Sequence, residues 1–263
     1  MGGASDTSPA GGVQPPPAAA PGLLGVEQRV VGPLQERVGA AGIVLGELGG
    51  AIERNELSLA FQPQWRLSDG RCDSVEALLR WQHPVLGSVG PSVFVPMAED
   101  GGLIGSVGRW ALERACRAAL ELDAERPAAM VEGWSMSVNV SVRQLQQDGF
   151  AAELIDVVER SGWGLHRLEL ELTESLQLSR QELVAANLEA VAAAGARLAI
   201  DDFGTGYASF GQLEQLGVSK LKLDRSLIRL LDGEVPRPAL PQAMITLGRS
   251  LGMVVVAEGV ETL

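Results

Sequence analysis

Cysteine and histidine are scarce in this sequence. Its 263 residues include two cysteines, Cys72 and Cys116, and two histidines, His83 and His166. Neither type is clustered at the spacing of zinc ligands, and two cysteines are too few for a disulfide framework. The composition therefore argues against a zinc centre and a disulfide-stapled secreted scaffold. It fits a reducing compartment, so we expect a cytoplasmic protein.

Long apolar runs are also absent. No stretch approaches the ~18 uninterrupted apolar residues that a membrane-spanning helix requires. The apolar run Val38–Leu45 is short and lies too far from the N-terminus to be the core of a signal peptide. We therefore expect neither a membrane span nor a secretion signal, although apolar residues make up 46% of the chain.

Basic residues are outnumbered by acidic ones. Lysine and arginine total 21 against 33 aspartates and glutamates, which gives a formal charge of −12. This balance opposes any function that needs a broad basic surface, so we expect no nucleic-acid polymer as a partner. If the substrate is an anionic nucleotide, a cation must be recruited locally.

The N-terminal segment differs in composition from the rest of the chain. Residues 1–33 are rich in Gly, Ala, Pro and Ser, and proline lacks the backbone donor that regular structure needs. We predict a disordered segment over residues 1–33 and one folded domain over residues 34–263.

Beyond this segment, short apolar strands alternate with amphipathic helices, a pattern typical of a largely parallel sheet with crossover helices. The helices are expected at Ser106–Asp123, Gln181–Ala194 and Pro241–Leu251, and Gly195 and Gly252 should end the last two in a left-handed conformation. Seven strands are expected: Leu57–Gln64, Ser74–Arg80, Ser135–Val140, Leu168–Thr173, Arg197–Asp201, Lys220–Leu223 and Met253–Ala257.

The connection between the first two strands contains Asp69-Gly70, a hairpin signal, so this pair should be antiparallel. A closed α/β barrel needs eight strands, and the chain stops at Leu263 just after the seventh. Either the pattern misses one strand or the α/β barrel is truncated before its eighth strand, and we expect the truncated barrel.

Chemically useful side chains gather at the ends of the expected strands. The carboxyl ends of barrel strands meet at one mouth, where functional groups lie. A single acid there is usually a helix cap or a solvated loop residue. Several converging carboxylates repel one another unless they are paired or metal-bound. The residues in question are Glu76, Asn139, Glu171, Glu174, Asp201, Asp202, Lys222, Asp224, Glu258 and Glu261.

Oxygen donors without histidine or thiol suit Mg²⁺ or Mn²⁺. Two such ions could bridge a phosphodiester and acidify a bound water. Lys222 could help to deprotonate or orient that water, or it could be a salt-bridge partner of Asp202 or Asp224, and the residues leave both readings open. Glu169 lies two residues before Glu171 on the same strand, so both should face the same side, with Glu169 deeper in the barrel. The pattern assigns no function to Glu169.

Several motifs follow one another in order from about residue 41: Gln62-Pro63, Glu76–Trp81 with His83-Pro84, Phe94–Glu99, Asn139, Glu171–Ser175, Asp201–Tyr207, Lys222–Ser226 and Ala257–Thr262. Together they closely resemble the EAL-domain family of cyclic di-GMP phosphodiesterases, whose name is spelled by Glu76-Ala77-Leu78. The resemblance implies a modified TIM (β/α)8 barrel with an antiparallel first strand. It also implies two-metal hydrolysis of cyclic di-GMP to linear pGpG in bacterial second-messenger signalling.

The resemblance also implies roles for individual residues. Lys222 resembles the water-activating residue, Glu174 the residue that steadies the loop Asp202–Tyr207, and Glu261 a contact of the metal site. Gln62, Leu78, Arg80 and Asp224 match positions that hold the nucleotide. The implied metal ligands are Glu76, Asn139, Glu171, Asp201 and Glu258, with Asp202 serving the second metal.

Family members often dimerise through the loop after Asp202, so the resemblance also implies a homodimer. The family normally continues beyond Leu263 with another helix, an eighth strand and a glutamine near the metals. Two other readings stay open: a receptor that binds cyclic di-GMP without turnover, and a structural module whose acids are solvated. The presence of every matched ligand favours the enzyme.

Overall fold

The computed structural model describes residues 45–174, 181–204, 216–231 and 238–260. The chain divides into two units, residues 1–31 and 32–263, and all described residues belong to the second. The expected disorder of residues 1–33 therefore lies outside the description and stays a prediction, as does the domain boundary at residue 34.

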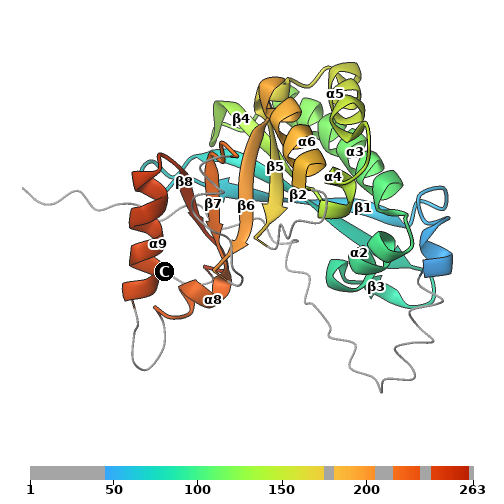
Figure 1. Ribbon diagram of the computed structural model, residues 1–263, viewed down its shortest axis with the longest axis horizontal. Helices are drawn as coiled ribbons and strands as arrows, with labels where there is room; N and C mark the ends of the chain where they lie inside the picture. Colours follow the sequence, from blue (N-terminus) through green and yellow to red (C-terminus); the bar gives the residue numbers. More distant parts are fainter. Residues whose placement is uncertain (1–44, 175–180, 205–215, 232–237, 261–263) are drawn as a thin grey trace, which may run out of the picture. The chain divides into compact units, whose positions relative to one another are not determined.

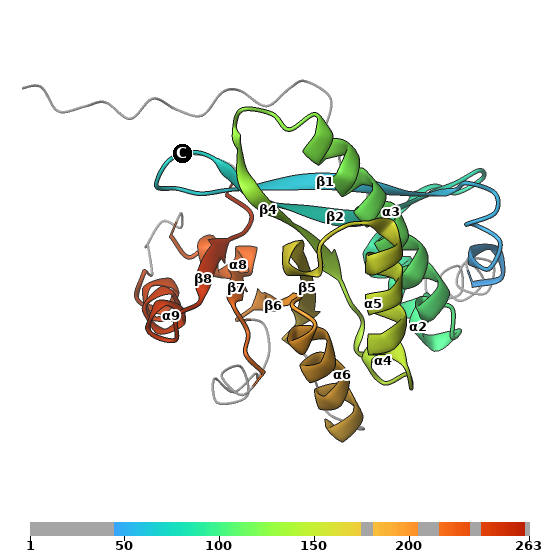
Figure 2. The ribbon, with the colours of Figure 1, turned by 90° about the horizontal axis from the view of Figure 1, so that it is seen from above.

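A curled, mostly parallel sheet carries the fold (Figure 1, Figure 2). Its strands follow the order β1-β2-β4-β5-β6-β7-β8, with β3 beside β2. β1 pairs with β2 in antiparallel fashion, and the pairs from β2–β4 onward are parallel. The strands are β1 Leu57–Trp65, β2 Cys72–His83, β3 Gly87–Val89, β4 Met130–Asn139, β5 Leu168–Thr173, β6 Arg197–Phe203, β7 Lys220–Leu223 and β8 Val254–Ala257.

All seven expected strands are therefore present, and the antiparallel first pair is confirmed. Gly70 takes φ +65° in the turn between β1 and β2, and the Asp69 side chain accepts a hydrogen bond from the Arg71 N–H at 3.2 Å. The sheet is an incomplete barrel because, in the described residues, its path ends at β1 and β8 without closing. β3 was not expected, because its three residues are too few to produce a periodic pattern.

Helices α3, α5, α6 and α9 lie on the outer side of the curled sheet (Figure 2). The three expected helices are α3, α6 and α9, and Gly195 and Gly252 have φ of +106° and +75°, as predicted. Four others were not expected, among them α5, whose Leu154, Val157 and Val158 do carry helical spacing. The described helices are α2 Pro91–Asp100, α3 Ile104–Ala124, α4 Val142–Leu145, α5 Phe150–Ser161, α6 Gln181–Ala193, α8 Arg225–Ile228 and α9 Ala239–Ser250, with a 3₁₀ turn at Leu165–Arg167.

The alternation along β5 shows how the core orients the interior of the sheet. Leu168, Leu170 and Leu172 are fully buried in the core cluster that also contains residues of α3, α5 and α6. Each fully buried leucine stabilises the fold by about 1.5–3 kcal/mol. Since successive strand residues face opposite sides, this packing directs Glu169 and Glu171 into the interior.

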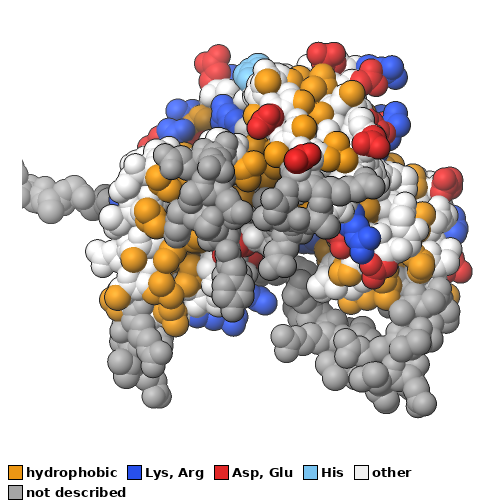
Figure 3. All heavy atoms as spheres, in the orientation of Figure 1, with side chains coloured by type: hydrophobic (Ala, Val, Ile, Leu, Met, Phe, Trp, Pro, Cys, Tyr) orange, Lys and Arg blue, Asp and Glu red, His pale blue; other side chains and the backbone are white. Residues whose placement is uncertain are grey.

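Among the residues that the structure describes, no helix combines the length and apolar character that a membrane crossing needs. On the face shown in Figure 3, acidic and basic side chains lie interspersed among apolar ones.

A part-buried ion pair joins α3 to the 3₁₀ turn that precedes β5. The Arg167 guanidinium donates to both oxygens of Asp123 at 3.0 and 2.8 Å, and its Cζ lies 4.0 Å from the ring centroid of Trp163. The Trp134 indole N–H also donates to Asp123, at 3.0 Å. The hydrogen bonds from Arg167 are the main reason that the pKa of Asp123 is lowered to about 2.

We expect Asp123→Asn to lower the free energy of unfolding at pH 7 by about 1–2 kcal/mol, because an amide pairs less strongly with Arg167. The pKa of Asp123 is depressed by folding, so this stabilisation is present above its unfolded value of about 4 and is lost as pH falls through about 2. Urea unfolding of both proteins from pH 7 down to pH 2.5 measures the difference.

Asp156→Asn is the control, because Asp156 forms an exposed i,i+4 pair with Arg160. It should change stability by less than about 0.5 kcal/mol. A stability difference for Asp123→Asn that stays constant down to pH 2.5 would contradict the assignment.

Candidate functional site

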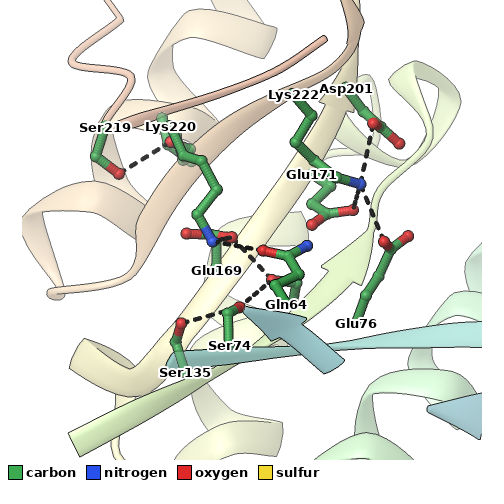
Figure 4. A network of polar contacts seen from close by, with 12 residues as sticks. Gln64, Ser74, Glu76, Ser135, Glu169, Glu171, Asp201, Ser219, Lys220 and Lys222 are labelled. Atoms are coloured by element: carbon green, nitrogen blue, oxygen red, sulfur yellow. Dashed lines mark hydrogen bonds and ion pairs between the residues drawn. The ribbon is translucent and has the colours of Figure 1, made fainter. Parts of the chain in front are cut away.

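Five strands bring one polar side chain each to the same end of the sheet interior. Glu76 lies on β2, Asn139 ends β4, and Asn139 pairs in register with Glu171 on β5. Asp201 on β6 lies opposite Thr173, and Lys222 is on β7. Glu258 follows β8 directly and hydrogen-bonds through its N–H to the Leu223 carbonyl. In Figure 4 the side chains of Glu76, Glu171, Asp201 and Lys222 point toward one another.

Lys222 lies at the centre of this group, and its side chain is 1% exposed. Its Nζ forms ion pairs with Glu76 Oε2 (3.0 Å), Glu171 Oε2 (2.7 Å), Asp201 Oδ1 (3.0 Å) and Glu258 Oε1 (2.9 Å). Burial disfavours an ammonium, but these carboxylates outweigh burial and raise the pKa of Lys222 above its usual value. Lys222 is therefore a cation here, and the four acids of these ion pairs differ from Asp202 and Asp224, the partners that the sequence suggested.

The carboxylates are undercompensated by this single ammonium. Burial, followed by repulsion from Glu76, raises the pKa of Glu171 well above its usual value. Burial and then Asp201 likewise raise the pKa of Glu258. Glu171 Oε1 is buried and has no hydrogen-bond partner within the described part of the chain. A buried carboxylate oxygen without a hydrogen-bond partner, among several acids, is the kind of ligand atom that a bound cation would satisfy.

The acids form two overlapping groups, each suited to one cation. Glu76, Glu171 and Asp201 offer oxygens within 4.8 Å of one another, and so do Asp201, Asp202 and Glu258. Asp201 is shared. Asp202 has φ +53° beside a register shift in β6, which lets two successive residues contribute to one site.

Charge and donor type support the same reading. If the five carboxylates ionise, the set with Lys222 has a net charge of −4, which two divalent ions would neutralise. Asn139 lies beside the acids, and its Nδ2 donates to Glu76 Oε1 at 3.0 Å. Oxygen ligands without histidine or thiolate fit hard cations such as Mg²⁺ or Mn²⁺.

Glu174 lies just after β5 and contacts the segment that follows β6. The Gly204 N–H donates to Glu174 Oε2 at 3.0 Å. Gly204 has φ +103°, a backbone conformation that favours glycine, and a Cβ there would displace the Leu227 side chain. Glu174 therefore anchors the start of the predicted loop, whose residues 205–207 lie outside the described residues, as does Glu261.

The residues predicted to hold the nucleotide lie beside the acids. Gln62 on β1 pairs in register with Glu76. Leu78 and Arg80 alternate with Glu76 along β2 and line a cavity of about 590 Å³, together with Asn139, Asp201 and Asp202. The fourth, Asp224, caps α8, where it accepts a hydrogen bond from the Ser226 N–H at 2.8 Å. Although partial burial opposes it, this bond helps to lower the pKa of Asp224.

A second set of polar residues lies below the acids and was not expected apart from Glu169. Ser74, Ser137 and Lys220 are buried in the sheet interior. Each lies two residues before a predicted site residue. This spacing is the sequence signal that could have placed them on the same interior face as the site.

The sequence profile of the EAL domain matches residues 46–263. The chain belongs to the EAL domain family. EAL phosphodiesterases are metal-dependent in general, and this EAL domain has a carboxylate cluster that could bind metal.

Two relatives and one solved structure are similar to this EAL domain over most of its length. The bifunctional diguanylate cyclase/cyclic di-GMP phosphodiesterase MucR of Pseudomonas aeruginosa is 39% identical over 220 residues, which cover 83% of this chain and 31% of MucR. An uncharacterized signaling protein of Caulobacter vibrioides is 38% identical over 216 residues, covering 82% of this chain and 26% of the relative. The chain thus spans less than a third of the length of either relative.

The solved structure is that of the PaMucR phosphodiesterase in complex with c-di-GMP. It superimposes on this EAL domain with a TM-score of 0.75 and 38% sequence identity, covering 84% of this chain and 87% of that chain.

Proposed function

We propose that this EAL domain is a cytoplasmic phosphodiesterase that hydrolyses cyclic di-GMP to linear pGpG with two divalent cations, Mg²⁺ or Mn²⁺. The observation that carries the proposal is the cluster of described acids at Lys222, which forms two overlapping ligand groups that share Asp201. The c-di-GMP complex of the PaMucR phosphodiesterase supports the choice of substrate.

Glu76, Asn139, Glu171 and Asp201 would hold one cation, and Asp201, Asp202 and Glu258 the second. When bound, such cations polarise a phosphodiester and make a bound water acidic enough to ionise near neutral pH. Lys222 would orient the attacking water and balance negative charge on the reacting phosphate, since its ammonium lies against four of the acids.

The cavity along β2 would hold the dinucleotide. Leu78 offers an apolar contact, Gln62 lies next to Glu76 on the neighbouring strand, and the planar fork of Arg80 can pair with phosphate or a guanine edge. Glu174 would steady the loop beyond Gly204, and Glu261 would support the metal ligands. Asp224 caps α8 with its carboxylate, and it would contact the nucleotide from that position.

Incubation of the purified chain with cyclic di-GMP and Mn²⁺ or Mg²⁺, with an EDTA control, tests the proposal by chromatography of the products. We expect pGpG in either metal and none in EDTA. A folded chain that binds cyclic di-GMP in both metals and yields no pGpG would be a receptor, and the phosphodiesterase proposal would be wrong.

Arg80→Ala should raise KM for cyclic di-GMP about tenfold and change kcat by less than about threefold, because binding contacts are lost away from the reacting phosphate. Arg80→Lys should recover only part of the loss, since an ammonium cannot form a forked pair. Steady-state kinetics measure both. Arg160→Ala, which removes an exposed arginine on α5, is the control. A fall in kcat with unchanged KM would contradict this binding role and would mean that Arg80 acts in the chemical step.

A further inference from the structure

A layer of buried polar residues lies directly beneath the acids (Figure 4). Ser74, Ser137, Glu169 and Lys220 lie two residues before Glu76, Asn139, Glu171 and Lys222, on the same strands β2, β4, β5 and β7. Two-residue spacing puts each pair on one face of its strand. We call this layer the polar platform: Gln64, Ser74, Ser135, Ser137, Glu169 and Lys220.

The members of the platform are joined by short contacts. Lys220 Nζ lies 2.6 Å from Glu169 Oε1 and donates to Gln64 Oε1 at 3.0 Å. The Ser137 hydroxyl donates to Glu169 Oε1 at 2.8 Å. Ser74 Oγ lies 3.2 Å from both Ser137 Oγ and Ser135 Oγ, which extends the network to β2. The platform thus links β1, β2, β4, β5 and β7 across the interior.

The Lys220–Glu169 pair repeats the arrangement of the Lys222–Glu171 pair two residues earlier on each strand. Both pairs join β7 to β5 over the intervening β6. On β6, Ala199 is the register partner of both Glu171 and Lys220, and its small side chain leaves room for the two lysines to cross. Lys220 is 6% exposed and Glu169 is 1% exposed.

Lys220 and Lys222 are the only lysines in the sequence, and all other basic side chains apart from the two histidines are arginines. Lysine carries a compact charge with three donors on a flexible stem, which suits a crowded interior better than a planar guanidinium. A buried ion pair rarely stabilises a fold more than apolar residues of similar volume would, and its best-attested use is to fix the register in which elements pack.

We propose that Lys220 and Glu169 are positioning residues, which fix β7 against β5 so that Lys222 and Glu171 meet in the metal and substrate site. The expected effect on turnover rests on the proposed function. The expected effects on the position of Lys222 and on Mg²⁺ binding rest on the geometry of the site. Lys220 also neutralises Glu169, so the platform adds no net charge beneath the acids.

The double variant Glu169→Gln/Lys220→Met tests this, because it removes both charges together and keeps the side-chain volumes. Protein labelled with ¹³Cε-lysine gives one NMR signal for each of the two lysines, so Lys222 is observed directly. In the double variant we expect a melting temperature close to that of the wild type and a displaced Lys222 signal. The Mg²⁺ concentration at half-saturation of that signal should rise about tenfold, and kcat should fall about tenfold.

The control is Asp123→Asn/Arg167→Met, which removes the part-buried ion pair between α3 and the 3₁₀ turn before β5, away from the acids. It should leave the Lys222 signal and the Mg²⁺ midpoint unchanged. If Glu169→Gln/Lys220→Met behaves in the same way, the platform is only structural and the inference is wrong.

If the double variant does not fold, Ser137→Ala decides, since it removes a single donor to Glu169. A displaced Lys222 signal with a weaker Mg²⁺ midpoint supports positioning, and unchanged values overturn it. The NMR and Mg²⁺ readouts need no turnover. A wild-type chain that forms no pGpG while these readouts respond would therefore sink the proposed function and leave the positioning role standing.

Discussion

Glu76→Gln should reduce the rate of pGpG formation about a thousandfold, equivalent to about 4 kcal/mol in the activation barrier. Glu76 belongs to the first ligand group, accepts a hydrogen bond from Asn139 and pairs with Lys222. Glutamine keeps the shape but removes the charge, so cation binding and the alignment of Lys222 are both weakened. Initial rates at saturating Mn²⁺ measure the effect.

Glu132→Gln is the matched control, because Glu132 is an exposed glutamate on β4 away from the acids. It should keep the wild-type rate within about twofold. A Glu76→Gln protein with more than a tenth of wild-type activity would contradict the assignment of Glu76 as a ligand. Unchanged metal binding as well would favour a module whose acids are merely solvated.

Lys222→Met should destabilise the metal-free protein by about 3–5 kcal/mol, because it removes the ammonium from a buried group of carboxylates. Divalent cations should reverse much of this loss, so Mn²⁺ should raise the melting temperature of the variant more than that of the wild type. Turnover should fall about a hundredfold even with metal bound, since water is no longer oriented. Calorimetry with and without Mn²⁺, together with initial rates, measures these effects.

The same melting experiment on Glu76→Gln provides the comparison. Removal of an acid relieves repulsion, so this variant should gain less from Mn²⁺ than the wild type does. An equal Mn²⁺ shift in Lys222→Met, Glu76→Gln and wild type would show that the ion binds away from these acids.

Much of the fold could be predicted because the sequence pattern is locally consistent. In β5 the leucines alternate with Glu169 and Glu171, and this spacing alone gives the strand, its buried face and the direction of both acids. The Asp69-Gly70 turn likewise fixed the antiparallel first pair. The convergence of Glu76, Asp201 and Lys222 follows from a parallel sheet whose carboxyl ends meet.

Other features depend on contacts that no local pattern contains. Lys220 meets Gln64 across the sheet interior, 156 residues away in sequence. Serines such as Ser74 and Ser137 carry no charge that would mark them as members of a network. The positive φ of Asp202 depends on a register shift in β6, and the capping by Asp224 depends on where α8 begins. Tertiary context decides each of these.

The most direct measurement of the central claim is hydrolysis of cyclic di-GMP in ¹⁸O-labelled water with Mn²⁺, followed by mass spectrometry of the product. Attack of water on phosphorus with cleavage of one phosphorus–oxygen ester bond predicts pGpG carrying a single ¹⁸O in its terminal phosphate, and none of this product in EDTA. Intact cyclic di-GMP after incubation with the folded, Mn²⁺-loaded chain would contradict the account.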